Sequence, residues 1–167
     1  MSAKPKPASK SDPQTNWRRV VELVQCSRAM DAIEERELVP GKKIFYQFSA
    51  RGHDMAQVLL GLQLTHPKDA ICGYYRSRPI LLALGVALED ALGSAMGRAG
   101  GYSDGRDIGV VFNYPNAHGA SALPMCGGVG AQYTPTAGYA QAIEYAKNVL
   151  GDRSYDGAIG VVLGGDA

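Results

Sequence analysis

The sequence predicts an α/β protein in which a helical start leads into a parallel sheet. Apolar residues recur at roughly helical spacing from Trp17 to Val39, and Pro40 with Gly41 then ends the pattern. Residues 158–163 form an uninterrupted apolar run, which suits a central parallel strand covered on both faces. An amphipathic helix followed later by such a strand is typical of α/β architecture.

The remaining elements are predicted from short apolar stretches and from the positions of proline and glycine. Thr134 and Pro135 are a typical helix start, as N-cap residue and first-turn proline. Eleven of the 21 glycines lie between Gly93 and Gly138, and a stretch of this kind inside a domain is usually functional or mobile. Helices are expected over residues 52–64, 79–84, 88–96 and 134–150, and strands or extended segments over 43–48 and 70–75.

Length and composition indicate one globular domain preceded by a tail. The chain has 167 residues, of which 46% are hydrophobic and 20% charged, so enough apolar material exists for a core. The net charge of +1 gives no electrostatic case for binding nucleic acid or a membrane. Residues 1–16 lack large apolar side chains and are predicted to be a disordered tail, which leaves residues 17–167 as the domain.

The cysteines favour an intracellular protein. Cys26, Cys72 and Cys126 stand far apart, are odd in number and form no CxxC pair. The simplest interpretation is three reduced thiols. We therefore expect a cytoplasmic protein.

The end of the chain carries a candidate metal site. Gly165 and Asp166 directly follow the apolar run, and ligands of open α/β sheets bind beyond the carboxyl ends of the strands. A carboxylate there is a natural ligand for Mg²⁺, and a glycine allows the backbone to approach a phosphate. The alternative is an ordinary turn, for which Asp and Gly are also preferred.

Two further segments could bind an anion. In the Tyr74–Arg78 segment a guanidinium can bind phosphate oxygens with two parallel hydrogen bonds. We expect one arginine of the pair, Arg76, to face the site and Arg78 to face solvent or a surface carboxylate. Glycines 127–130 precede a helix start, where anions and cofactors often bind, although the pattern is not GxGxxG. The alternatives are a surface arginine pair and a flexible loop.

Taken in order, several segments resemble one family. These are residues 27–36, the RGHDMAQV stretch at 51–58, the YYRSRPILLALG stretch at 74–85, VGAQ at 129–132 and Gly165-Asp166. They are similar to the alpha subunit, or alpha half, of the E1 component of pyruvate and branched-chain 2-oxo acid dehydrogenases. The resemblance covers the chain from residue 17 onward and implies the N-terminal part of a thiamine-diphosphate-binding fold.

This resemblance implies roles for several residues in cofactor binding. Tyr75 and Arg76 would contact the diphosphate of thiamine diphosphate. Gly127 and Val129 would contact the aminopyrimidine through backbone and packing. In such a site the protein binds and orients the cofactor, which carries the difficult chemistry.

The resemblance also implies a metal ligand and a substrate-side residue. Gly165 and Asp166 match the start of the family's GDG…N motif, which makes Asp166 a Mg²⁺ ligand. Ala167 stands where that motif has its second glycine, and the chain as given stops inside the motif. Phe48 would lie beside the substrate end of the site.

The implied activity is decarboxylation of a 2-oxo acid on thiamine diphosphate, followed by acyl transfer to a lipoyl acyltransferase, the E2 component. An E1 beta subunit or beta half would complete the enzyme, as in a heterotetramer. The chain as given would be inactive alone, because the partner's activating glutamate and the end of the metal motif are absent. Two alternatives stay open: another thiamine-diphosphate transferase of the transketolase type, and a non-catalytic fragment that only pairs with a partner chain.

Overall fold

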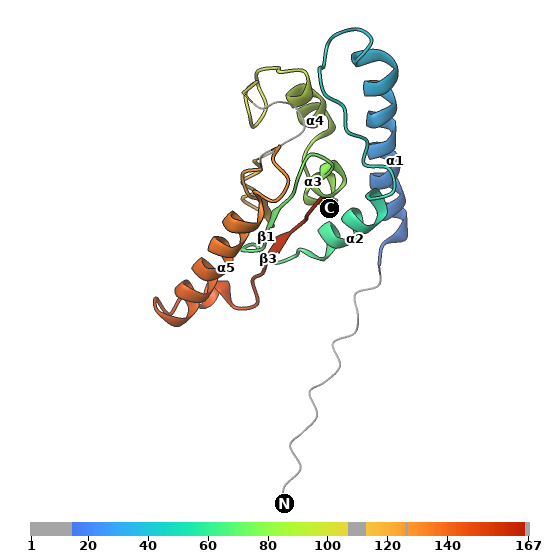
Figure 1. Ribbon diagram of the computed structural model, residues 1–167. Coiled ribbons are helices and arrows are strands. Elements are labelled where there is room, and N and C mark those ends of the chain that lie inside the picture. Colours follow the sequence, from blue (N-terminus) through green and yellow to red (C-terminus); the bar gives the residue numbers. More distant parts are fainter. Residues whose placement is uncertain (1–14, 107–112, 126, 166–167) are drawn as a thin grey trace, which may run out of the picture.

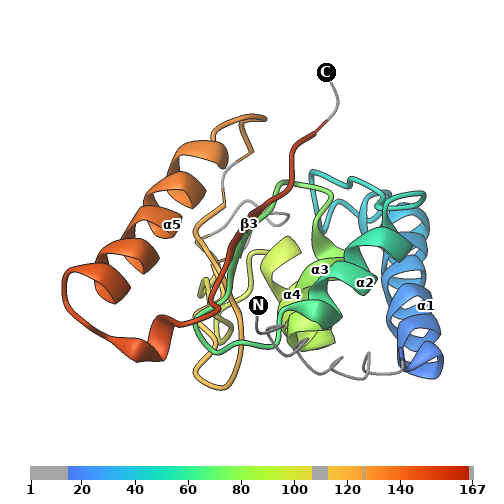
Figure 2. The same ribbon diagram turned by 90° about the horizontal axis from the view of Figure 1, so that it is seen from below.

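A small parallel sheet lies between a layer of helices and a single long helix in the computed structural model, which describes residues 15–106, 113–125 and 127–165 (Figure 1). Helices α1 to α4 lie on one side of the sheet and α5 lies on the other (Figure 2). The predicted α/β class with a helical start and a parallel sheet is confirmed. The predicted tail lies outside the described residues up to position 14.

The sheet has the order β2-β1-β3 within the described residues, and both pairings are parallel. Strand β1 (Ala70–Cys72) is central, and each of its three residues is 0% exposed. Strand β2 (Ser121–Ala122) pairs with one side of β1 and β3 (Gly160–Val162) with the other. The strand predicted at 158–163 is present as β3, which pairs with β1 and is half-buried in the described part of the chain. An apolar run indicates that a segment packs against other residues. It does not indicate the position of a strand in the sheet, which depends on the connections between strands.

Asp69 ties the amino ends of the three strands together. Its buried carboxylate accepts hydrogen bonds from the backbone N–H groups of His66 and Ile159, each at 2.9 Å. Its backbone carbonyl accepts from the N–H of Ser121 at 3.0 Å. One buried residue thus sets where β1, β2 and β3 begin.

The helical layer consists of four helices and one π-helical turn. Asn16 caps the first helix, because its side-chain oxygen accepts from the N–H of Arg19 at 3.1 Å. A Cβ atom on Gly61 would lie 2.6 Å from Cβ of Ala83, so α2 and α3 approach too closely for a larger residue. The elements are α1 (Trp17–Ile33), η1 (Glu34–Leu38), α2 (Asp54–Gln63), α3 (Arg78–Leu84) and α4 (Leu88–Ala95).

The hydrophobic core joins this layer to the sheet. Val20 of α1, Val58 of α2, Ile71 of β1 and Ile80 of α3 are each fully buried and belong to one cluster. The core thus packs α3 against β1, and the loop between these two elements is held at both ends. None of the helices in the described part of the chain is long and apolar enough to cross a membrane.

Helix α5 (Tyr133–Asn148) covers the second face of the sheet and begins one residue before the predicted start. Thr134 and Pro135 lie in its first turn, and the N-cap position belongs to Gln132, whose side chain does not cap the helix. The hydroxyl of Tyr139 donates to the carbonyl of Lys68 at 2.8 Å and so fixes α5 to the start of β1. A short 3-10 helix, η2 (Arg153–Tyr155), then leads to β3.

Residues 43–48 form no strand, although aromatic residues in a short run had favoured an extended element there. The backbone N–H groups of Lys43 and Ile44 donate to the carbonyl of Leu38 in η1, and Phe48 packs against Tyr75 in the loop after β1. The segment leads into residues 49 and 50, which carry polar contacts described below.

Candidate functional site

Three segments meet beyond the carboxyl ends of the parallel strands. Strand β1 leads into residues 73–77 and β3 leads into residues 163–165, at the same edge of the sheet. The turn at 127–132 reaches this edge from the other side. This is the edge at which open α/β sheets bind their ligands.

Gln132 fastens the glycine-rich turn to the end of β3. Its side-chain amide donates to the carbonyl of Leu163 at 2.8 Å, and its side-chain oxygen accepts from the N–H of Gly130 at 2.9 Å. Gln132 is buried, so these bonds do not compete with water. A single amide thus holds the turn that carries Gly127 and Val129 against the edge of the sheet.

Val129 and Gly165 lie against each other at this edge. A Cβ atom on Gly165 would come within 3.0 Å of Cγ1 of Val129 and 3.6 Å of Cδ2 of Tyr74. Gly127 is exposed in the same turn. Asp166 lies outside the described residues, so the predicted metal ligand has no described position.

Arg76 lies among aromatic rings and has no acidic partner among the described residues. Its guanidinium carbon is 5.4 Å from the ring centroid of Tyr75 and 5.8 Å from that of Phe48, distances typical of cation–π contacts. One guanidinium nitrogen donates to the backbone carbonyl of Ser49 at 2.7 Å. The remaining N–H groups and the full positive charge are therefore available to an anion.

Aromatic side chains connect Arg76 to the place where Val129 meets Gly165, which we call the glycine edge. The ring centroids of Phe48 and Tyr75 are 4.6 Å apart, and those of Tyr74 and Tyr75 are 5.2 Å apart in an edge-to-face arrangement. Tyr74 also lies beside Gly165, as described above, and its hydroxyl is 3.5 Å from Nδ1 of His53. The predicted residues Phe48, Tyr75 and Arg76 thus form one cluster, and Tyr74 links it to Val129 and Gly165.

Arg78 does not face solvent, and this part of the sequence prediction is wrong. It is the first residue of α3 rather than part of an extended segment, and its side chain is only 12% exposed. Its guanidinium binds Asp31 at 3.1 Å and Glu34 at 2.5 Å, and both carboxylates are buried. We call Asp31, Glu34 and Arg78 the inner charge cluster.

Asp31 also holds the segment that carries Phe48. Its second carboxylate oxygen accepts from the hydroxyl of Ser49 at 2.7 Å and from the backbone N–H of Ala50 at 3.1 Å. Ser49 is the residue whose carbonyl accepts from Arg76. The inner charge cluster and the aromatic cluster therefore share one short stretch of backbone.

The carboxylates of the helical layer differ in their affinity for protons. Burial raises the pKa of Glu34, and the charge and hydrogen bonds of Arg78 offset this only in part. In contrast, the side-chain hydrogen bond from Arg28 lowers the pKa of Asp54. Burial is the largest influence on Glu34 and the hydrogen bond from Arg28 the largest on Asp54, so the two pKa values move in opposite directions.

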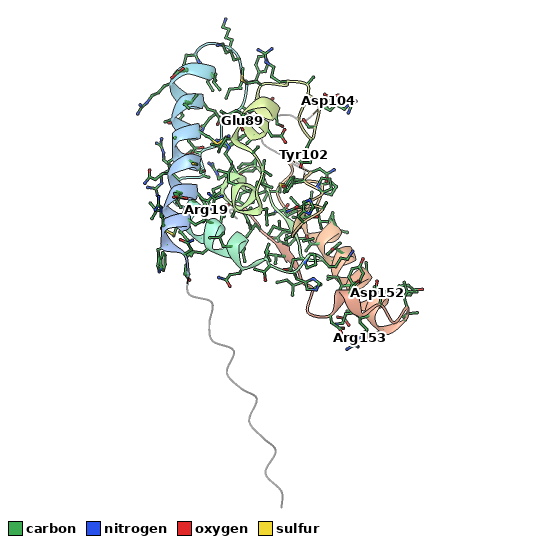
Figure 3. All side chains as sticks on the ribbon, turned by 180° about the vertical axis from the view of Figure 1, so that it is seen from behind. Arg19, Glu89, Tyr102, Asp104, Asp152 and Arg153 are labelled. Atoms are coloured by element: carbon green, nitrogen blue, oxygen red, sulfur yellow. The ribbon has the colours of Figure 1, made fainter. Side chains whose placement is uncertain are left out.

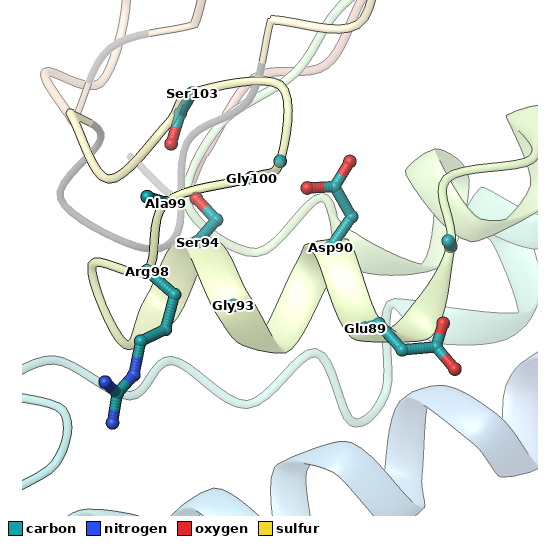
Figure 4. Close-up of a pocket in the computed structure, with 10 residues that line it drawn as sticks. Glu89, Asp90, Gly93, Ser94, Arg98, Ala99, Gly100 and Ser103 are labelled. Atoms are coloured by element: carbon teal, nitrogen blue, oxygen red, sulfur yellow. The ribbon is translucent and has the colours of Figure 1, made fainter.

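A cavity of about 520 Å³ lies away from this edge, between α4 and the loop at 97–103. Asp90 and Ser94 point from α4 toward that loop, whereas Arg98 points away (Figure 4). Glu89 and Tyr102 lie near this cavity, whereas Arg153, in the short helix that follows α5, lies at the other end of the molecule (Figure 3). None of the predicted site residues lines the cavity, so it is a separate feature.

Sequence reasoning missed the polar residues that hold the site together. Gln132 lies inside the VGAQ stretch, yet that stretch was assigned only backbone and packing contacts. Asp31 lies in the 27–36 segment of the resemblance but was given no role there, and Ser49 lies in none of the segments. Their contacts join positions 18 to 47 residues apart, so a linear pattern could not reveal them.

The geometry defines a class of protein: an α/β protein with a basic and aromatic site beyond the carboxyl ends of a parallel sheet. Residues 9–167 match the family described as Dehydrogenase E1 component, and the chain belongs to this family. The family is that of 2-oxo acid dehydrogenase E1 components, which are thiamine-diphosphate-dependent. No curated protein gives a significant match to the chain.

Proposed function

We propose that this chain forms the diphosphate-binding side of the thiamine diphosphate site in a 2-oxo acid dehydrogenase. The observation that carries the proposal is Arg76, a cation at the carboxyl edge of the sheet that no carboxylate in the described residues neutralises. A diphosphate supplies the missing negative charge, and a guanidinium binds it with charge-assisted hydrogen bonds.

The surroundings of Arg76 fit this ligand. Phe48 and Tyr75 exclude water from one side of the guanidinium, which strengthens its attraction for an anion. At the other end of the site Gly165 leaves little room for a side chain beside Val129, so a ligand meets backbone there.

Each residue then has a role in holding the cofactor. Tyr75 and Arg76 bind the diphosphate, and Gly127 and Val129 contact the aminopyrimidine. Phe48 lies on the substrate side. Thiamine diphosphate, when bound, supplies the stabilised carbanion chemistry that removes carbon dioxide from a 2-oxo acid.

The metal part of the proposal concerns Gly165 and Asp166. A diphosphate in a protein is commonly accompanied by Mg²⁺, which takes one or two carboxylates together with phosphate oxygens. We assign that carboxylate to Asp166 on the match to the family's metal motif. Among the described residues no group of three His, Cys, Asp or Glu side chains is placed to hold a metal.

The proposed enzyme decarboxylates a 2-oxo acid and passes the acyl group to the lipoyl group of an acyltransferase, the E2 component. An E1 beta subunit or beta half supplies the other side of the cofactor site, in a heterotetramer. Membership of the E1 component family supports both partners.

Calorimetric titration of the full-length protein with thiamine diphosphate in excess Mg²⁺ tests the proposal. Arg76→Ala removes a charge-assisted contact worth about 1.5–3 kcal/mol, so affinity should fall roughly ten- to hundredfold. Arg153→Ala, which changes an exposed arginine far from the site, is the matched control and should bind normally. Absence of binding by the unaltered protein, or equal binding by Arg76→Ala, would refute the proposal.

A further inference from the structure

The orientation of Arg76 depends on the backbone of Ser49. The guanidinium donates to the Ser49 carbonyl at 2.7 Å, and this is the contact that directs its charged end between Phe48 and Tyr75. A long, flexible side chain at a half-exposed position has many rotamers, so the carbonyl selects one of them. Whatever fixes Ser49 therefore also fixes Arg76.

Ser49 is fixed by Asp31, which lies on a different element. One oxygen of the Asp31 carboxylate accepts hydrogen bonds from the Ser49 hydroxyl and the Ala50 N–H, and the other accepts one from the Arg78 guanidinium. Residues 43–53 contain no helix or strand, so these side-chain bonds take the place of secondary structure in holding residues 49 and 50.

The contacts form a closed ring. Arg78 lies two residues after Arg76 at the start of α3, so the path runs from Arg76 through Ser49 and Asp31 to Arg78 and back along the chain. Asp31 is only 1% exposed, and in such surroundings hydrogen bonds to a carboxylate are stronger than in water.

We propose that Asp31 is a positioning residue that presents Arg76 to the cofactor diphosphate through the Ser49 backbone. The inference rests on the proposed function, since it presupposes that Arg76 binds the diphosphate. Asp31 itself touches no ligand in this scheme. It sets affinity by keeping the guanidinium oriented before the ligand arrives, which lowers the entropy lost on binding.

A purely structural role for Asp31 makes a different prediction. If Asp31 only stabilises the fold, its loss and the loss of Arg76 affect binding independently, and the two effects add. If Asp31 acts through Arg76, its loss has no further effect once Arg76 is gone. A double-mutant cycle on cofactor affinity separates these two cases.

The experiment uses the full-length protein and five variants: Asp31→Asn, Arg76→Ala, their double variant, and the control Asp69→Asn alone and combined with Arg76→Ala. Asp69 is also a buried carboxylate that accepts backbone N–H bonds, but it lies at the opposite end of β1. The readouts are the dissociation constant of thiamine diphosphate in excess Mg²⁺ and the thermal unfolding midpoint. Neither requires turnover.

We expect Asp31→Asn to weaken the binding of thiamine diphosphate about fivefold or more when Arg76 is present. In the Arg76→Ala background the same change should weaken it less than about twofold, because residues in one network are coupled. Asp69→Asn should lower the unfolding midpoint without this coupling. Additive effects of Asp31→Asn and Arg76→Ala would overturn the positioning role while leaving the proposed function intact. Absence of cofactor binding by the unaltered protein would instead overturn both.

Ser49→Ala covers the case in which Asp31→Asn does not fold. It removes one hydrogen bond to Asp31 and leaves the inner charge cluster and the Ser49 carbonyl in place. The same cycle with Arg76→Ala should show smaller coupling of the same sign. Full additivity for Ser49→Ala would count against the proposal in the same way.

Discussion

Two arginine–carboxylate contacts join α1 to the helices beside it, and they differ in depth. Arg28 binds Asp54 of α2 at 2.5 Å and is 46% exposed, so we call this contact the outer ion pair. Arg78 of the inner charge cluster is 12% exposed and shared by two buried carboxylates. The outer ion pair touches one neighbouring helix, whereas the inner cluster also reaches Ser49 and through it Arg76.

The comparison shows that burial, rather than residue type, decides what an ion pair contributes. A partly exposed arginine can exchange its carboxylate for water at modest cost. A buried arginine cannot, because its removal leaves carboxylates without compensation in a medium that solvates them poorly. The inner cluster should therefore be costly to break and specific in the geometry that it imposes.

The largest effect is expected from Arg78→Met. This change leaves Asp31 and Glu34 buried without a cation, and breaking a buried pair in this way costs about 3–5 kcal/mol. Urea unfolding followed by circular dichroism measures the free energy of unfolding. A loss below about 1 kcal/mol would show that water reaches the cluster and that the comparison is wrong.

Arg28→Met should destabilise the protein less than Arg78→Met. It leaves one buried carboxylate, and Asp54 keeps its bond from the N–H of Met55 at 2.9 Å. The same urea unfolding experiment compares the two variants directly. If Arg28→Met were the more destabilising, exposure of the arginine would not be the deciding quantity.

A smaller effect, which depends on pH, is expected from Glu34→Gln. The pKa of Glu34 is raised by burial, so the folded state binds its proton more tightly than the unfolded state does. The stability that this proton contributes is present below the ordinary glutamate pKa and is lost as pH rises through the raised value. The difference in unfolding free energy, wild type minus Glu34→Gln, should therefore fall from about pH 4 to pH 7. A pH-independent difference would contradict the assignment.

Asp54→Asn should show the opposite sign and the smallest effect. The bond from Arg28 lowers the pKa of Asp54, so its contribution is present above the ordinary aspartate pKa and is lost as pH falls through the lowered value. The advantage of wild type over Asp54→Asn should hold at pH 6 and shrink below about pH 4. Acid titration of the thermal unfolding midpoint in both proteins measures it, and an advantage that grew in acid would refute it.

Local elements were predictable where local chemistry sets them. Helix α1 follows from its apolar spacing, and α3 ends at Gly85, whose backbone φ of 103° favours glycine. Helix α5 was predicted to within one residue at its start. The family resemblance named Tyr75 and Arg76 for the diphosphate and Phe48 for the substrate end, and the structure brings these three into one cluster.

Long-range arrangements were not predictable from a single sequence. The position of β3 beside β1 depends on pairing between residues about 90 positions apart. Arg78 was assigned to the surface because its two partners lie 44 and 47 residues earlier and nothing in the sequence pairs them with it. Both arrangements depend on which distant residues meet, and neither periodicity nor turn chemistry indicates this.

The three-way contact of Asp69 has a consequence for the order in which the molecule folds. Helices α1, α2 and α3 all lie within residues 17–84, whereas Asp69 must find Ser121 and then Ile159, which is 90 residues away in the chain. Closing such long loops costs chain entropy before any contact compensates for it, so distant strand pairing is slow. We expect the helical layer to form first and β3 to dock last. The contact between Gly165 and Val129 then forms only in the final step of folding, after Arg76 is already in place.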